Sequence, residues 1–116
     1  MNCVIGEIMN LYEFILVIKV RPGMYFGNNI TINNIGFFIN GFLCGKSVSK
    51  LDSFDVFFKD EFPRFVRKSL GIELTEFEFW FETIDRYAND SDGAINIFFM
   101  LFDDFYALYE RINKAK

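Results

Sequence analysis

The side chains of this sequence that most resemble a catalytic pair are carboxylates, which occur as adjacent pairs at Asp60-Glu61 and Asp103-Asp104. Two carboxyl groups act as general acid and general base when their surroundings drive their pKa values apart. Neighbouring residues of a helix, however, point about 100° apart and do not face each other. We therefore interpret both pairs as surface charge and predict no catalytic residue.

Other reactions lack the groups they require. The sequence has no histidine, so no Ser, Cys or Lys has a recognisable base to activate it. No glycine-rich phosphate-binding loop occurs either. Asp90-Ser91-Asp92-Gly93 begins like a calcium-binding loop, but the later acidic ligands of such a loop are not at the required positions. We expect a protein that is not an enzyme and that uses no cofactor and no metal ion.

Charge is unevenly divided along the chain, whose net charge is −4. Residues 1–70 hold eight Lys/Arg and six Asp/Glu, whereas residues 71–116 hold four Lys/Arg and ten Asp/Glu. An acidic half repels phosphate, which disfavours direct binding of nucleic acid. The same half suits a basic protein partner through steering and charge complementarity. Plain solvation of the surface is the simpler alternative.

The beginning of the sequence lacks the basic segment of a signal peptide. The longest unbroken apolar run, Phe14–Ile18, is far below the roughly 20 residues that a membrane span needs. Two cysteines, Cys3 and Cys44, do not make a disulfide framework. We expect a cytoplasmic protein without a membrane partner, and we assign no role to either cysteine.

Two groups of side chains combine rings with carboxylates, which is the chemistry of a surface that binds a basic protein. One group shares a side of the last predicted helix and includes Phe99, and the other lies near residue 80. A helix that neighbours cover on nearly all sides explains the rings equally well. The predicted binding residues are Glu78, Phe79, Glu82, Asp103, Tyr106 and Glu110.

Hydrophobic periodicity predicts the first three helices. The first covers residues 5–19, although the β-branched run at residues 15–18 also suits a strand. The second starts from a cap at Thr31 or Asn33 and ends near Gly45. The third starts at Asp52 or Ser53 and ends at Leu70-Gly71. Pro63 removes a helical hydrogen bond, so we expect a kink there or a new start capped by Asp60.

Two further helices follow. The fourth is predicted to start at Thr75, because Glu78 lies three residues on at the spacing of a capping box. On this helix Phe79 falls on the side of Glu82 and Arg86, which are spaced to form an ion pair. The opposite face of this helix comprises Phe77, Trp80, Phe81, Ile84, Tyr87 and Ala88. The fifth helix covers residues 92–112. Close packing is the expected reason for Gly36 and Gly41 within the second helix.

The segment between the first two predicted helices reads Arg-Pro-Gly-Met-Tyr-Phe-Gly and contains strong turn signals. A similar RPGMYxG segment occurs in the ATPase domain of type II topoisomerases. Those enzymes carry a catalytic Glu and a Mg-binding Asn in the next helix and a later DxGxG motif. Here residues 32–45 contain no Glu or Asp, and no DxGxG follows. We therefore set the ATPase interpretation aside.

The order of motifs resembles a family of small bacterial proteins that are encoded beside polymorphic toxins and proposed as their immunity proteins. After RPGMYxG come Gly41-Phe42, the segment Phe62–Lys68, a helix with one Trp, and the segment Ala94–Asp103. The family residues are expected to be structural: Arg21, Pro22, Gly23, Met24, Tyr25, Gly27 and Trp80. Pro63 and the 17 Phe residues depart from the family pattern.

The resemblance implies binding and steric neutralisation of a cognate toxin domain, as in contact-dependent growth inhibition. Such a toxin is expected to be a basic nuclease, with an RNase favoured. We predict that residues 1–116 form one all-α domain, a single compact bundle of about five helices, with a monomer favoured. The alternative function is a small regulatory or interaction domain without a toxin partner, in which exposed Phe side chains form a homodimer interface.

Overall fold

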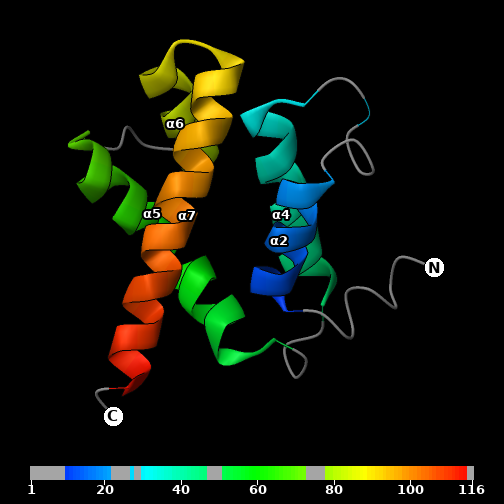
Figure 1. The fold of residues 1–116 in the computed structure, drawn as a ribbon, viewed down its shortest axis with the longest axis vertical. Helices are drawn as coiled ribbons and strands as arrows, with labels where there is room; N and C mark the ends of the chain where they lie inside the picture. Colours follow the sequence, from blue (N-terminus) through cyan, green and yellow to red (C-terminus); the bar gives the residue numbers. More distant parts are fainter. Residues whose placement is uncertain (1–9, 22–26, 28–29, 47–50, 73–77, 115–116) are drawn as a thin grey trace.

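The computed structural model describes residues 10–21, 27, 30–46, 51–72 and 78–114. Five helices pack into one bundle, and these ranges contain no strand (Figure 1). The predicted all-α architecture is therefore confirmed. The helices are α2 (Leu11–Val20), α4 (Ile32–Gly45), α5 (Ser53–Leu70), α6 (Trp80–Ala88) and α7 (Ser91–Lys114).

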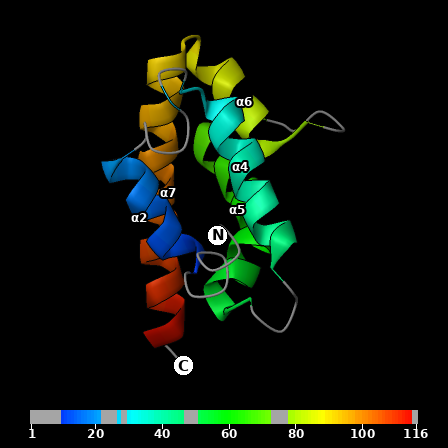
Figure 2. The same ribbon diagram turned by 90° about the vertical axis from the view of Figure 1, so that its right-hand side faces the viewer.

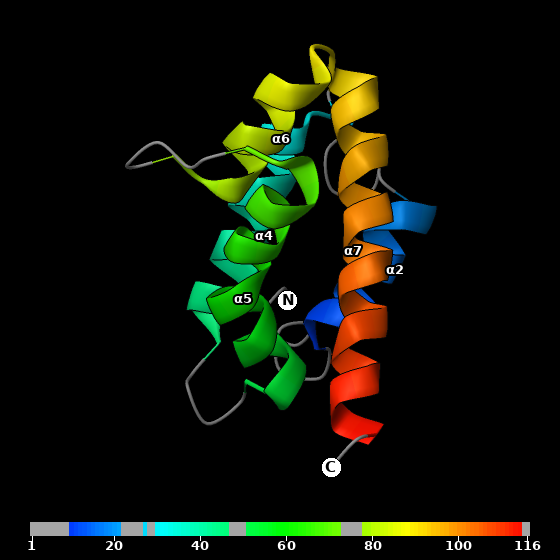
Figure 3. The same ribbon diagram turned by 90° about the vertical axis from the view of Figure 1, so that its left-hand side faces the viewer.

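The longest helix, α7, packs mainly against α6 and α5, whereas α2 packs mainly against α5 and α4. Figure 2 shows α4 on the outside of the bundle, with α5 behind it. In Figure 3 α2 and α7 lie beside each other and run in opposite directions. Contacts between their side chains support this antiparallel arrangement. Tyr12 near the start of α2 stacks on Tyr106, whereas Lys19 near the end of α2 contacts Asp103, which comes earlier in α7. Among the described residues, no helix combines the length and the apolar character needed to cross a bilayer.

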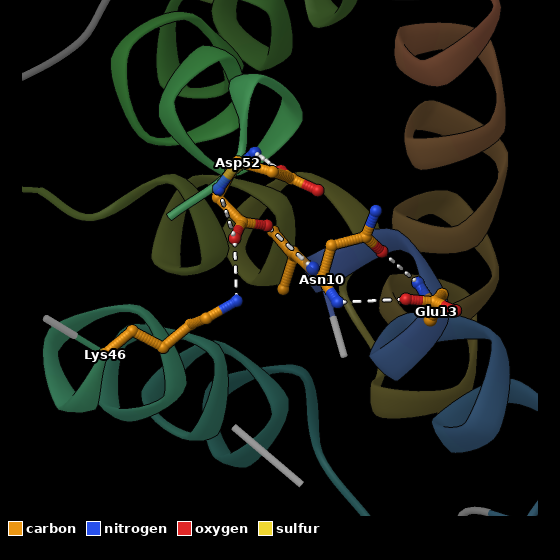
Figure 4. Close-up of polar contacts among 6 residues, drawn as sticks. Asn10, Glu13, Lys46 and Asp52 are labelled. Carbon is orange, nitrogen blue, oxygen red and sulfur yellow. Dashed lines mark hydrogen bonds and ion pairs between the residues drawn. The ribbon is translucent and has the colours of Figure 1, made fainter. Parts of the chain in front are cut away.

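Local capping explains where α2 begins. The Asn10 side chain accepts a hydrogen bond from the Glu13 backbone, and the Glu13 carboxylate accepts one from the Asn10 backbone (Figure 4). Such a reciprocal pair provides acceptors for two backbone N–H groups that have no partner at the start of a helix. The predicted residues 5–9 lie outside the described residues, and the strand alternative for residues 15–18 is wrong because they belong to α2.

Helix α4 begins where predicted, because the Thr31 hydroxyl accepts from the Asn34 backbone at 3.1 Å. Gly36 lies against α6 so closely that a Cβ there would stand 2.1 Å from the Phe81 ring. Close packing therefore explains Gly36, as expected. It does not explain Gly41, where a Cβ would meet nothing within 4 Å.

Helix α5 runs through Pro63 without a new start, so of the two alternatives the new start capped by Asp60 is wrong. Pro63 cannot donate a backbone hydrogen bond, but the apolar face around it is buried. Phe58, Phe62 and Val66 on that face are almost fully inaccessible to solvent. Their burial on both sides of Pro63 offsets the lost bond.

Helix α6 starts at Trp80, so the prediction that it includes Glu78 and Phe79 is wrong, and its predicted start at Thr75 lies outside the described residues. Phe79 occupies the cap position in extended conformation, and its backbone N–H donates to the Glu82 carboxylate at 2.9 Å. The predicted Glu82–Arg86 pair is also wrong, since Arg86 binds Glu78 instead at 2.8 Å. Glu82 thus supplies half of a capping box, because the Phe79 side chain has no acceptor for the reciprocal bond.

Aromatic rings from three helices form the centre of the core. Phe54, Phe58 and Phe62 of α5 meet Phe105 of α7 in edge-to-face and tilted contacts. Trp80 closes this centre by stacking on Phe98 at 5.3 Å between ring centroids. Each such pair contributes about 0.5–1.5 kcal/mol beyond the area it buries. The core of the described residues is therefore built largely of aromatic rings.

Candidate functional site

The predicted surface on α7 lies partly against α2. Asp103 is exposed and forms an ion pair with Lys19, whose ammonium nitrogen lies 3.5 Å from its carboxylate. The same Lys19 nitrogen lies 5.8 Å from the centre of the Phe99 ring. Both contacts are solvent-exposed, so each contributes little to stability. They nevertheless cover one flank of the predicted surface and offset part of its negative charge.

Tyr106 belongs more to the packing between helices than to the surface. Its ring stacks on Tyr12 with 3.7 Å between centroids and meets Phe54 edge-on at 5.1 Å. Burial, followed by the Glu110 carboxylate, raises the pKa of the Tyr106 phenol. The sequence allowed this ring to lie either on an exposed binding surface or beneath neighbouring helices. Its contacts support the second position.

The outward side of α7 carries an acidic surface that sequence reasoning found only in part. Met100 is 54% exposed, and the side chains one and two turns further along are also exposed. Asp104 and Glu110 form no ion pair with any described residue. The α7 face, as we call it, consists of Met100, Asp103, Asp104, Ala107 and Glu110. Spacing of three and four residues from Met100 was the signal that could have identified it.

The second predicted group lies at the start of α6. Glu78 is engaged internally, because its carboxylate accepts from the Thr83 hydroxyl at 2.7 Å and from Arg86. Glu82 caps the helix, as described above. Phe79 is 49% exposed and lies edge-on to Phe37 of α4, with centroids 6.3 Å apart. Phe79 therefore joins this group to α4, whereas Asp103 and Tyr106 join the α7 group to α2.

Sequence reasoning missed a buried polar junction centred on Asp55. One Asp55 oxygen accepts from the Leu11 backbone at 2.7 Å. The other accepts from the Lys46 ammonium at 3.0 Å and from the Asp52 backbone at 3.3 Å. Figure 4 shows Lys46 reaching from the end of α4 toward Asp52 at the start of α5. The junction ties three helix ends together around a carboxylate that is fully buried.

Nothing else in the described residues gathers groups for chemistry. No cluster of three or more His, Cys, Asp or Glu residues in this part of the chain could hold a metal ion. A shallow depression on α2 is lined by apolar side chains and the end of the helix: Leu16, Val17, Val20 and Arg21. It brings no set of polar atoms together.

The family-motif residues divide between core and turn. Trp80 is buried against Phe98, and Gly27 has a positive φ of 62° that suits a turn. Arg21 is exposed, and Pro22, Gly23, Met24 and Tyr25 lie outside the described residues. No protein-family model, curated protein or solved structure matches the chain.

Proposed function

We propose that this protein is an immunity protein, which binds a cognate toxin domain in the cytoplasm and blocks it without chemistry. The favoured toxin is a basic nuclease of the RNase class. The α7 face is the observation that carries the proposal, because it exposes three carboxylates around the apolar side chains of Met100 and Ala107. The motif resemblance to immunity proteins of polymorphic toxins supports the same function.

Electrostatics gives the proposed mechanism. A nuclease must present positive charge where it holds the phosphate backbone. Carboxylates placed over that surface attract it and exclude the nucleic acid by the same interaction. Lys19 offsets part of the charge of Asp103, so Asp104 and Glu110 supply the negative charge that no described ion pair offsets. Binding should therefore weaken as ionic strength rises.

Apolar contact supplies the rest of the proposed interface. Met100 lies one turn from Asp103 and Asp104, and its flexible thioether adapts to the shape of a partner. Tyr106 contributes only the part of its ring that Tyr12 leaves open. Glu78, Phe79 and Glu82 form a separate candidate region, in which Phe79 is the exposed anchor.

Co-expression with the domain encoded immediately upstream tests the proposal. We expect rescue of the cells and a complex that co-purifies. Asp104→Lys should weaken the complex by at least about tenfold, because it places positive charge against a basic surface. Asp60→Lys is the matched control, since Asp60 is also exposed but lies on α5.

Each result bears on a different part of the proposal. An upstream product that is harmless, or toxic but neither bound nor neutralised, would exclude the immunity function. The regulatory or interaction domain would then take its place, favoured by the exposed rings of Phe37 and Phe79. Equal affinity of the Asp104→Lys and Asp60→Lys variants would remove the α7 face from the interface.

A further inference from the structure

Among the five described helices, α4 alone carries no charged residue on any side. The 14 residues of α4 include no Asp, Glu, Lys or Arg. Five of its exposed residues define the α4 face: Phe37, Phe38, Gly41, Cys44 and Gly45. Figure 2 shows α4 on the outside of the bundle.

The rings of this face are held in place from below. Phe37 is 59% exposed, yet its ring lies edge-on to the buried Phe81 at 5.0 Å and to Phe79 at 6.3 Å. Phe38 is 37% exposed and stacks on Phe14. Such rings lose little conformational freedom when a partner covers them, which favours binding.

The shape of the α4 face is complementary to itself. Its rings lie in the first half of the helix, whereas Gly41 and Gly45 leave the second half flat. A Cβ at either glycine would meet nothing within 4 Å, so the space above them is open. Two copies packed antiparallel, with the symmetry axis at Gly41, would place Phe37 of one copy over Gly45 of the other. An isologous dimer needs this kind of self-complementarity.

The absence of charge on α4 favours a second copy of the chain as the partner that covers the α4 face. Two chains with a net charge of −4 repel each other, and like charges brought face to face oppose association. Contact through α4 places no charged residue of one helix opposite its copy. A basic or acidic partner would gain no ion pair from the same surface. We propose that the α4 face is the interface of an antiparallel homodimer with its two-fold axis at Gly41.

The size of the face sets the strength of the dimer. Phe37 and Phe38 are 59% and 37% exposed. With about 200 Å² for a whole Phe side chain, these two rings offer on the order of 200 Å² per copy. A stable interface buries about 800 Å² per partner, so the rings supply about a quarter of that area. A reversible dimer that dissociates on dilution follows.

Sedimentation of the full chain from micromolar to millimolar concentration tests the dimer. The mass should rise from that of one chain, 13.7 kDa, toward twice that value. Gly41→Glu should raise the dissociation constant by at least about tenfold, because equal charges then meet at the axis. The fold should survive, since the site is open and Glu is a better helix former than Gly. Asn96→Glu on α7 is the matched control and should dimerise like the wild type.

A mixing experiment identifies the symmetry. Gly41→Lys alone should also be monomeric, whereas an equal mixture of the Gly41→Glu and Gly41→Lys proteins should dimerise again. A wild-type protein that remains monomeric at millimolar concentration overturns the proposal. So does a dimer that persists in Gly41→Glu. If the wild type is monomeric and Gly41→Glu instead abolishes capture of the upstream domain, the α4 face belongs to that partner and the homodimer is rejected.

Discussion

Replacement of Asp55 by Ala should destabilise the protein more than any surface substitution of similar size. The change removes one acceptor group that binds the Leu11 backbone, the Asp52 backbone and the Lys46 ammonium. Asp55 is fully buried, and the Lys46 side chain is only 4% exposed. Water therefore cannot readily replace the lost contacts.

The magnitude follows from these contacts. A hydrogen bond to a charged group contributes about 1.5–3 kcal/mol, and the three bonds share one carboxylate, so they do not add fully. Removal of one partner of a buried ion pair costs about 3–5 kcal/mol. We expect a loss in this range for Asp55→Ala, which is a large part of the roughly 5–15 kcal/mol that stabilises a domain of this kind. The melting temperature should fall by roughly 15 °C.

Urea unfolding followed by tryptophan fluorescence is the assay, because the chain has one Trp and it is buried on Phe98. Asp60→Ala on the exposed side of the same helix is the control and should change the free energy of unfolding by less than about 0.5 kcal/mol. A double-mutant cycle with Lys46→Met should give a coupling energy of at least about 1 kcal/mol. A loss below about 1 kcal/mol for Asp55→Ala would refute the assignment of this junction as the tie between three helix ends.

Three further outcomes are expected. Gly36→Ala should cost about 1–3 kcal/mol of unfolding free energy, because the new methyl group would overlap the buried Phe81 ring; an unchanged denaturation midpoint would contradict that packing. Gly41→Ala should instead stabilise the monomer by about 0.5–1 kcal/mol, measured in dilute solution, since its site is open. The Tyr106 phenol, with its ordinary pKa of 10.0 raised by burial, should ionise later than a free tyrosine in a phenolate absorbance titration compared with Tyr106→Phe. Its contribution to stability is complete below about pH 10 and is lost as pH rises through the raised pKa, because the folded state holds the proton more tightly; a normal titration would contradict the burial.

Local sequence signals determined most helix boundaries of this protein. Thr31 and Asp52 cap α4 and α5 as expected, and Gly71 ends α5 with a positive φ of 65°. Each of these signals acts between residues three to five positions apart, so it is present in the sequence itself. The ring core was foreseeable for a similar reason, because the spacing of Phe along each helix defines which side is apolar.

Only the tertiary structure decided how those sides meet. Thr75 and Glu78 have the spacing of a capping box, yet α6 begins only at Trp80, which packs against Phe98, and Glu82 accepts from the Phe79 backbone instead. Tyr106 fitted a binding surface equally well until Tyr12 of α2 stacked on it.

Asp55 gave the weakest local sign of its role, since its partners Leu11 and Lys46 lie 44 and nine residues away. Periodicity shows that a side chain points inward or outward, but it carries no information about which distant residue lies opposite. That pairing depends on how the helices cross, which is fixed by packing of the whole bundle.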